Sequence, residues 1–408
     1  MTKPIGPIPP EFAEQRGMLH IAGRPAEHWA AQAGATPCFV YHPAVATARI
    51  ARFRAAFAGV DLHYAIKANP FPPLLTVMAP LVDGFDVASA GELARALVGK
   101  PAAAISFAGP GKRDAELAAA IEAGATINVE SEGEADRALA QGDRLGRRPR
   151  LAVRVNPDVE LRGSGMRMGG RASPFGIDAA RAGALARRLI AAGADWRGWH
   201  VYAGSQALDA QAIVDTHAAT LALTRRLGDE AGSVPPLVNL GGGVGVPYFA
   251  GDRPLDVEAV GAALAASLAA TDLPGTRLAI ELGRWLVAEC GVYLTRVVDR
   301  KVSMGETFLV CDGGLHHQLA ATGNLGTVVR RNYPLALARA MGEPAAEEVS
   351  VVGPLCTPLD RIGDHVGLPR AAAGDLIAVF LAGAYGATAS PAAFLGHPPA
   401  AELLAGEA

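Results

Sequence analysis

The sequence lacks most features that mark secreted, membrane-spanning or metal-binding proteins. It contains four cysteines, Cys38, Cys290, Cys311 and Cys356, and none forms a CxxC pair, so neither a zinc site nor a disulfide framework is expected. No apolar run reaches the roughly 18 residues that cross a bilayer. The start, MTKPIGPIPPEF, lacks the basic and then apolar layout of a secretory signal. These absences predict a cytoplasmic protein with no membrane partner.

The sequence also lacks an excess of charge of either sign. Its 37 basic and 40 acidic residues give a net charge of −3, and no run of lysine or arginine stands out. A nucleic-acid partner is therefore not expected, and the ligand is predicted to be a small molecule. Hydrophobic residues make up 50% and charged residues 19% of the chain, which excludes global disorder. A length of 408 residues predicts two to three domains, at about 150 residues per domain.

Short apolar runs alternate with long Ala/Leu/Arg stretches of helical character, which predicts an α/β fold. Eight βα units within residues 43–284 predict a closed (β/α)8 TIM barrel, and an open doubly wound sheet is the alternative. The expected strands end near Ile66, Val87, Phe107, Val129, Val155, Ala203, Leu240 and Glu281.

The texture of the sequence changes after about Leu286, where runs rich in Val, Thr and Tyr predict antiparallel strands. We therefore expect a second, mostly antiparallel β domain at residues 285–408. Residues 1–42, a leader followed by the strand CFVY at 38–41, are expected to join it. The leader at 1–30 and the Ala-rich tail after Pro398 are expected to be poorly ordered ends.

Polar residues and glycines recur where the barrel strands end, and in TIM barrels this end carries the active site. They are Lys67, Asp86, Arg154, Ser205, Gly241, Gly242, Gly243, Glu281 and Arg284. Lys67 follows the apolar strand LHYAI, so partial desolvation would lower its pKa and make it an amine nucleophile for an aldehyde. The alternative is a lysine at the barrel rim whose amine simply reaches solvent.

The run NLGGGVGVPY suggests a phosphate cradle, because glycines leave backbone N–H groups open to phosphate oxygens. Ser205 and Arg284 can add a hydroxyl and a positive charge, and a plain structural turn is the alternative. Glu281 is placed to face a heteroaromatic nitrogen and keep it protonated, which would make the ring an electron sink. A structural glutamate paired with arginine is the alternative.

Other polar residues lie in the second domain. Cys356 sits between two prolines and ahead of Asp360 in GPLCTPLD, and a stiff loop of this kind suits a positioned acid or contact residue, although a lone cysteine is often packing. His316 and His317 are adjacent and are not expected to point the same way, so no metal site is predicted. Asp312 and Asp364 are interpreted as turn residues.

Several motifs in fixed order carry a resemblance to a known family. They are YAIKANP, FDVASAGEL, HVYAGSQ, NLGGGVG, ELGR, GPLCTPLD and GAYG. On these motifs the chain resembles the alanine-racemase-fold (type III) pyridoxal-phosphate-dependent decarboxylases, which include the diaminopimelate and ornithine decarboxylases. The resemblance covers residues 36 to 398.

The resemblance implies an amino-acid decarboxylase that uses pyridoxal 5′-phosphate. Lys67 would hold the cofactor as an internal aldimine, and carbon dioxide would leave by way of a quinonoid. The other implied cofactor contacts are Gly241, Gly242, Gly243, Ser205, Arg284 and Tyr385 at the phosphate, Glu281 at the pyridine nitrogen, and Asp86 and Arg154 near the ring. The resemblance further implies a homodimer with shared active sites, in which Cys356 of the second copy returns a proton and Asp360 is a neighbouring contact.

Two departures from the family pattern bear on the substrate. The family often places a histidine over the cofactor ring where this sequence has Tyr202, with His200 two residues earlier. Relatives that bind a distal amino group commonly have an acid after the loop cysteine, where this sequence has Thr357. Thr357 argues against lysine, ornithine or diaminopimelate, and CTPLDRIGD and SPAAFLGHP resemble a branch of the family that includes enzymes of modified or carrier-attached amino acids. The expected substrate is an amino acid or a modified or carrier-attached amino acid, with Thr357 among its contacts. A racemase and a catalytically silent homologue are the alternatives, and Glu281 argues against the racemase.

Overall fold

The computed structural model describes residues 2–158, 164–167, 170–271, 273–323 and 330–406, and these pack as two compact units. The barrel unit comprises Arg49–Gly245 and Leu255–Gly283, and the sheet unit comprises the chain up to Ala48, Val246–Pro254 and the chain from Arg284 onward. The domain limits expected at 42 and 284 stay a prediction.

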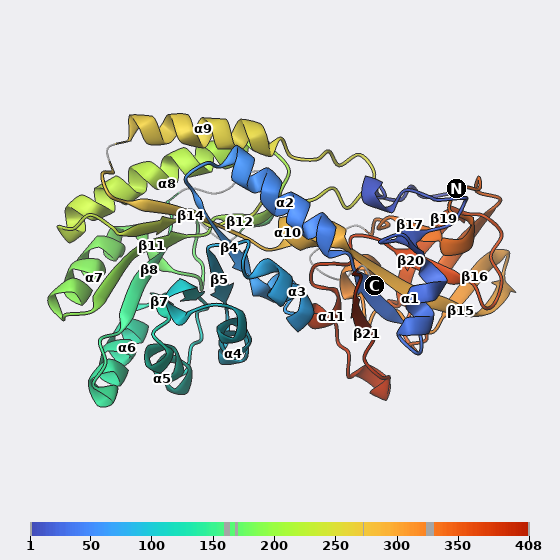
Figure 1. The fold of residues 1–408 in the computed structure, drawn as a ribbon, viewed down its shortest axis with the longest axis horizontal. Coiled ribbons are helices and arrows are strands. Elements are labelled where there is room, and N and C mark those ends of the chain that lie inside the picture. Colours follow the sequence, from blue (N-terminus) through green and yellow to red (C-terminus); the bar gives the residue numbers. More distant parts are fainter. Residues whose placement is uncertain (1, 159–163, 168–169, 272, 324–329, 407–408) are drawn as a thin grey trace. The chain divides into compact units, whose positions relative to one another are not determined.

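The barrel unit contains eight parallel strands that close on themselves (Figure 1). Their order is β4-β5-β6-β7-β8-β11-β13-β14, and β14 pairs with β4. The strands are β4 (Asp61–Ala65), β5 (Gly84–Val87), β6 (Ile105–Phe107), β7 (Thr126–Val129), β8 (Arg150–Asn156), β11 (Asp195–Val201), β13 (Leu237–Asn239) and β14 (Arg277–Leu282). The closed barrel predicted from the alternating pattern is thereby confirmed, and the expected strand ends lie within two residues of the observed ones.

Helices follow the strands along the chain, as the Ala/Leu-rich segments predict. They are α2 (Pro43–Ala56), α3 (Pro72–Met78), α4 (Ala90–Gly99), α5 (Asp114–Ala123), α6 (Glu132–Leu145), α7 (Ala179–Ala191), α8 (Ala210–Ala231) and α9 (Val257–Ala270). Ser89 and Ser131 begin α4 and α6 as N-caps, each accepting a hydrogen bond from a backbone N–H of the first turn. Three short strands, β9 (Ser164–Arg167), β10 (Ile177–Asp178) and β12 (Gly204–Ala207), complete the barrel unit.

The sheet unit is built around the long strand β15 (Gly291–Ser303), which pairs antiparallel with β3 (Cys38–Tyr41), β16 (Glu306–Cys311) and β20 (Leu376–Val379). The sheet continues through β17 (Leu335–Leu337), β18 (Glu347–Val352) and β19 (Arg361–Leu368). Two pairings, β16 with β18 and β21 (Ala401–Leu404) with β3, are parallel. A second, mostly antiparallel domain, which the alternating runs predict, is confirmed. The sheet unit also contains the short helices α10 (Arg284–Val287) and α11 (Gly386–Ala389).

The expectation that the two ends of the chain are poorly ordered is wrong. The leader forms β1 (His20–Ile21), β2 (Arg24–Pro25) and α1 (Ala26–Gln32), and its apolar side chains Phe12, Leu19 and Trp29 are buried in the core of the sheet unit. The tail forms β21, which adds to the sheet next to β3. Composition alone did not reveal this, because the apolar residues of the leader are sparse and find their partners only in distant strands.

Asp312 and Asp364 are also not simple turn residues. Asp312 follows β16 and accepts hydrogen bonds from the Thr295 hydroxyl and from the Arg296 backbone N–H, which ties two neighbouring strands together. Asp364 lies within β19 and forms ion pairs with Lys3 and Arg361. Both carboxylates therefore stabilise the sheet unit.

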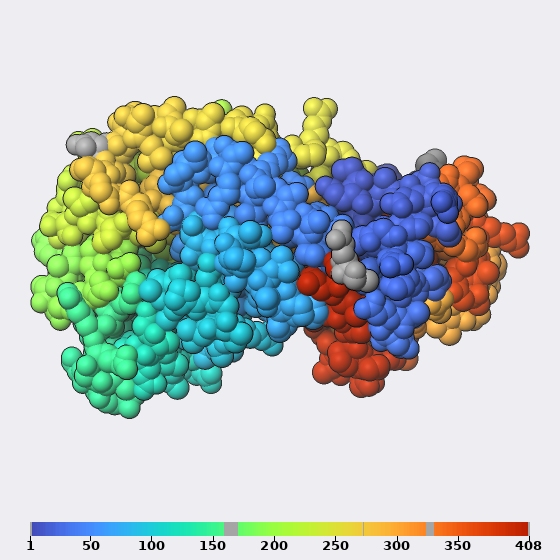
Figure 2. Space-filling model, in the orientation of Figure 1, coloured from blue at the N-terminus to red at the C-terminus, as the bar shows by residue number. Residues whose placement is uncertain are grey.

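The end of α2 packs closely against α9 on the outside of the barrel unit. Figure 2 shows the end of α2 and the alanine-rich helix α9 lying beside each other on the surface, and a Cβ built on Gly261 would lie 2.0 Å from the Ala56 carbonyl oxygen. Among the described residues, none of the helices combines the length and the apolar character that a bilayer crossing requires.

The burial of the leader makes a testable prediction about stability. Trp29 is 3% exposed and its indole N–H donates to the Ile21 carbonyl at 2.9 Å. Trp29→Ala should lower the free energy of unfolding by about 3–5 kcal/mol, because it removes a large buried side chain. Urea unfolding followed by circular dichroism measures this, with the exposed Gln32→Ala in the same helix as the control. Equal stability of the two variants would contradict the placement of the leader in the core.

Candidate active site

Polar side chains meet inside the carboxyl end of the barrel. Arg154 on β8 and Asn239 on β13 are the register partners of His200 on β11, which places the three residues at one level of the barrel. Glu281 lies near the end of β14, and Lys67 lies in a single 3-10 turn directly after β4. All except Lys67 are buried. The closed barrel thus brings together groups from strands that are far apart in the sequence.

Glu281 is a buried carboxylate with partners on both oxygens. Its Oε2 accepts a hydrogen bond from Asn239 Nδ2 at 3.2 Å and lies 3.0 Å from His200 Nε2. Its Oε1 lies 4.0 Å from Lys67 Nζ. Burial alone would raise the pKa of this carboxyl, but His200 and two nearby cations, Lys67 and Arg154, outweigh burial and hold the pKa well below its ordinary value. Glu281 is therefore charged at neutral pH.

Lys67 presents its amine at the mouth of the barrel. Its side chain is 46% exposed, and its Nζ lies 5.6 Å from the centroid of the Tyr202 ring. The turn that carries Lys67 is fixed from below, because the Tyr64 hydroxyl donates to the Asn69 carbonyl at 2.8 Å. The amine is therefore accessible to a dissolved aldehyde while its backbone is anchored. The lowered pKa expected from the sequence stays a prediction.

Arg154 is held in place by a buried carboxylate. Its Nη1 donates to Glu130 Oε1 at 2.8 Å, and Glu130 also accepts from the backbone N–H of Gly176 at 3.1 Å. Burial alone would raise the pKa of Glu130, but Arg154 and Lys112 outweigh it and lower the pKa. The guanidinium carbon lies 6.0 Å from the centroid of the Tyr202 ring. Tyr202 therefore has two cations, Arg154 and Lys67, within cation–π range.

Asp86 on β5 is a third buried carboxylate of the cluster. Its Oδ2 lies 3.5 Å from His63 Nδ1, and neither of its oxygens has a hydrogen bond within the described part of the chain. Burial alone would lower the pKa of His63, but the Asp86 carboxylate outweighs it and raises the pKa. Because buried oxygens without donors are rare in folded proteins, Asp86 is suited to accept a hydrogen bond from a bound molecule.

The three glycines after β13 form a tight crossing of backbone segments. A Cβ at Gly242 would lie 1.8 Å from the Glu281 carbonyl oxygen, so only glycine fits there. The Gly241 N–H donates to Asn239 Oδ1 at 2.8 Å, which corrects the expectation that all three N–H groups are open to an anion. Within the described residues, the N–H groups of Gly242 and Gly243 donate no hydrogen bond. The predicted cradle therefore has two backbone donors instead of three.

Ser205 lies on β12, and this strand is joined to the glycine segment. The Ala207 N–H donates to the Gly243 carbonyl at 2.8 Å, and the Gly245 N–H donates to the Ala207 carbonyl at 2.9 Å. Ser205 itself is 8% exposed. The predicted serine and the predicted Gly243 thus belong to adjoining backbone segments of the barrel unit.

Arg284 and Tyr385 come together within the sheet unit. The guanidinium carbon of Arg284 lies 4.7 Å from the centroid of the Tyr385 ring, and its Nη1 donates to the Tyr248 hydroxyl at 3.1 Å. Its Nε is buried and has no hydrogen bond among the described residues. Tyr385 adopts a left-handed backbone with φ of +61°, which turns the chain at the start of α11. The arrangement leaves an arginine N–H able to bind an anion.

Cys356 and Thr357 lie on the loop between β18 and β19. Cys356 is exposed, whereas Cys38, Cys290 and Cys311 are buried, and burial raises the pKa of the Cys38 and Cys290 thiols to about 12. Cys356 is therefore the one cysteine of the described chain that can meet a ligand. Thr357 is half-buried, and its backbone N–H donates to the Leu355 carbonyl at 2.8 Å.

Asp360 fixes this loop. Its Oδ1 accepts from the Leu315 N–H at 2.6 Å and its Oδ2 from the Leu355 N–H at 2.9 Å, and the residue is 2% exposed. Two glycines pack against this carboxylate. A Cβ would lie 2.1 Å from it at Gly314 and 2.3 Å from it at Gly353, so a larger residue at either position would clash with Asp360. The predicted substrate contact by Asp360 finds no support in this geometry, since both oxygens bind backbone of the loop and its neighbour.

His316 and His317 do not point apart as expected from their adjacency. Their ring centroids lie 3.8 Å from each other, and the ring of His397 lies 4.9 Å from that of His316. His317 uses its nitrogens on the Tyr293 hydroxyl and the Pro398 carbonyl. Among the described residues no group of three histidine, cysteine or acidic side chains is placed to hold a metal ion.

Sequence reasoning missed Glu130 and Asn239 of the barrel cluster, and it named His200 without giving it a role. Glu130 directly follows the expected strand end at Val129, so the same rule that found Lys67 would have found it. Asn239 and His200 lie inside strands, where a polar residue is noticed only once its neighbours across the barrel are known.

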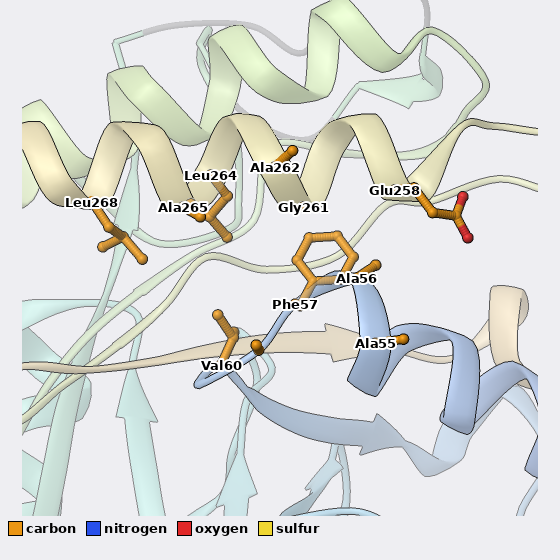
Figure 3. A pocket seen from close by; sticks show the side chains of 11 residues that line it. Ala55, Ala56, Phe57, Val60, Glu258, Gly261, Ala262, Leu264, Ala265 and Leu268 are labelled. Carbon is orange, nitrogen blue, oxygen red and sulfur yellow. The ribbon is translucent and has the colours of Figure 1, made fainter.

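An apolar pocket on the outside of the barrel unit is separate from this cluster. It has a volume of about 330 Å³ and lies between the end of α2 and α9 (Figure 3). Its walls include Phe57, Val60, Leu264 and Leu268, and its one charged residue, Glu258, forms an ion pair with Arg52. The pocket lacks converging polar groups and offers no chemistry.

Comparison with known proteins points to one family. Residues 44–288 match the family described as pyridoxal-dependent decarboxylase, pyridoxal binding domain. The chain is 35% identical to an L-glutamyl-[BtrI acyl-carrier protein] decarboxylase of Niallia circulans, over 90% of this chain and 88% of that protein. It is 30% identical to a 2-[(L-alanin-3-ylcarbamoyl)methyl]-2-hydroxybutanedioate decarboxylase of Staphylococcus aureus, over 83% and 86% of the two chains.

A solved structure shows the same fold. The diaminopimelate decarboxylase of M. jannaschii superposes with a TM-score of 0.87 at 25% identity, and the match covers 97% of this chain and 93% of that one. The family match lies on the barrel with its buried acid and its mouth lysine. The chain therefore belongs to the pyridoxal-dependent decarboxylases of the diaminopimelate and ornithine decarboxylase kind, and it decarboxylates amino acids with pyridoxal phosphate.

Proposed function

We propose that this decarboxylase acts on an amino acid whose distal end carries no free ammonium group, specifically a glutamyl-type amino acid attached to a carrier. The observation that carries this proposal is the loop after β18. Thr357 follows Cys356 there, and the carboxylate of Asp360 is engaged by backbone N–H groups. The loop therefore offers no free carboxylate to pair with a distal ammonium.

The names of two relatives support this substrate class. One is named for a glutamyl group on an acyl-carrier protein, and the other for an alanine whose side chain carries a carbamoyl group. Neither name describes a free distal ammonium group. Thr357 agrees with this, because relatives that bind a distal amino group commonly have an acidic residue at this position. We therefore favour the acylated or carrier-attached amino acid over lysine, ornithine or diaminopimelate.

The barrel residues fit pyridoxal phosphate. When bound, this cofactor supplies an aldehyde that bonds an amine and a ring that stores the electron pair left when carbon dioxide departs. Lys67 provides an accessible amine for the aldehyde. Charged Glu281, with Oε1 toward Lys67, would hold a proton on the ring nitrogen. Asp86 has two oxygens without donors, and Arg154 beside Tyr202 would lie near the ring.

The barrel unit offers backbone and side-chain donors for the cofactor phosphate. Gly242 and Gly243 have unused N–H groups, and Ser205 lies on the adjoining strand. Gly241 would shape this turn without donating, because its N–H is bound to Asn239. Arg284 has an unused Nε, and it lies against the ring of Tyr385.

We further propose a homodimer in which the loop of one copy completes the site of the other. Cys356 is the exposed cysteine of the described chain, so its thiol can return a proton to the substrate carbon after carbon dioxide leaves. The family resemblance supports this assignment, and Asp360 would keep the loop in shape for it.

The role of Lys67 can be tested directly. Lys67→Ala should abolish the visible absorbance of a cofactor joined to lysine and lower kcat by about 10³-fold or more, because the amine that carries the aldehyde is gone. Absorbance of the purified protein and carbon dioxide release measure the two effects. Lys301→Ala, which removes an exposed lysine of the sheet unit, is the control. Retention of the absorbance in Lys67→Ala would overturn the assignment.

The substrate proposal predicts a measurable preference. Carbon dioxide release should be faster from a glutamyl thioester on a carrier protein than from lysine, ornithine or diaminopimelate. Thr357→Glu should raise kcat/KM for lysine about 10-fold, since a new ion pair worth about 1.4 kcal/mol becomes available. Thr357→Gln, of similar size without the charge, should not. Efficient wild-type turnover of a free diamino acid would contradict the proposal.

Shared active sites predict complementation. Lys67→Ala and Cys356→Ala homodimers should each be nearly inactive, and mixing them should restore part of the wild-type rate, because each mixed dimer holds one site with both native residues. The rate after subunit exchange is the measurement, and each variant incubated with itself is the control. No gain on mixing, with exchange shown by mass spectrometry, would place both residues in the same copy.

A further inference from the structure

His200 is a buried imidazole in the centre of the polar cluster. It is 2% exposed and lies on β11 between Arg154 on β8 and Asn239 on β13. Its Nε2 lies 3.0 Å from Glu281 Oε2, and this is the one polar contact of the ring among the described residues. The imidazole of His200 therefore contacts the buried acid of the site, Glu281, through Nε2.

Only one ring nitrogen of His200 faces the carboxylate of Glu281. Neither nitrogen makes a hydrogen bond of good geometry within the described chain, but Nε2 lies 3.0 Å from Oε2. A proton on Nε2 is therefore attracted by the charged carboxylate.

Asn239 binds the same oxygen of Glu281, and its orientation is fixed. Its Oδ1 accepts from the Gly241 N–H at 2.8 Å, so its Nδ2 must be the group that contacts Glu281 Oε2 at 3.2 Å. Two nitrogens, one from His200 and one from Asn239, therefore converge on Oε2. Oε1 instead faces the amine of Lys67 at 4.0 Å.

We propose that His200 is a positioning residue that, together with Asn239, holds Oε2 of Glu281 and leaves Oε1 as the acceptor for the ring-nitrogen proton of the cofactor. This inference rests on the proposed function of Glu281. With Oε2 held by His200 and Asn239, Oε1 stays available to the ring. The other charged groups that face Glu281 are Lys67, Arg154 and, from the next strand, His63.

The tautomer can be measured without cofactor. Long-range ¹H–¹⁵N spectra of the full-length apo-protein distinguish a proton on Nε2 from one on Nδ1 or on both nitrogens, and loss of a signal in His200→Gln assigns the residue. We expect a proton on Nε2, the nitrogen that faces Glu281. A ring whose Nε2 carries no proton would overturn the proposal.

The loaded protein gives the second readout, with a matched pair of amide variants. His200→Gln places an amide nitrogen where Nε2 lies, and His200→Asn is too short to reach Glu281. With ¹⁵N-labelled pyridoxal phosphate, the ring nitrogen should stay protonated in wild type and His200→Gln and lose protonation in His200→Asn. The value of kcat should fall about 10-fold in His200→Asn alone.

Each remaining outcome decides the matter. Cofactor loss from His200→Asn alone supports the role, since only that variant lacks a donor to Glu281. Equal ring protonation and kcat in both variants, or cofactor loss from both, contradicts it. Failure of the wild-type protein to bind the cofactor would instead contradict the proposed function. The spectra of the apo-protein would still test the contact between His200 and Glu281.

Discussion

A single buried charge constrains the barrel unit. The carboxylate of Glu281 lies inside the barrel, where an unpaired charge would cost several kcal/mol. Asn239 and His200 contact one of its oxygens and Lys67 faces the other. Because Glu281 and these three partners come from four different strands or the turn after one, the charge is tolerated only when the barrel is closed and in register. The same closure delivers the acid and the amine to one face, so the interaction that stabilises the charge also builds the site.

Neighbouring parts of the cluster repeat this logic. Arg154 is held by Glu130, and Asp86 is paired at longer range with His63. Asn239 joins the acid to the glycine turn, because one amide contacts both Glu281 and Gly241. A shift of the glycine turn would therefore move the carboxylate of Glu281 through the side chain of Asn239. In the sheet unit, the buried carboxylate of Asp360 likewise fixes the loop that carries Cys356, because it binds backbone N–H groups of the loop and of a neighbouring segment.

The sequence by itself determined the architecture and much of the site. Alternation of apolar runs and helical stretches predicted the eight barrel strands, because periodicity of hydrophobic residues is a local property that folding must satisfy. Lys67, Glu281 and the glycine run were found for a related reason, as each directly follows or ends an apolar strand. The substitution at Thr357 was likewise readable from the sequence, and it directed the choice of substrate class.

Only the tertiary structure decided which polar groups meet. His200 and Asn239 lie inside strands and were recognised as partners of Glu281 only through the register of β11, β13 and β14 across the barrel. The same holds for Trp29 and the tail strand β21, whose partners are distant in sequence, and for the Gly241 N–H, which is bound to Asn239 and closed to an anion. Contacts between distant residues depend on strand register and side-chain direction, and local composition carries neither.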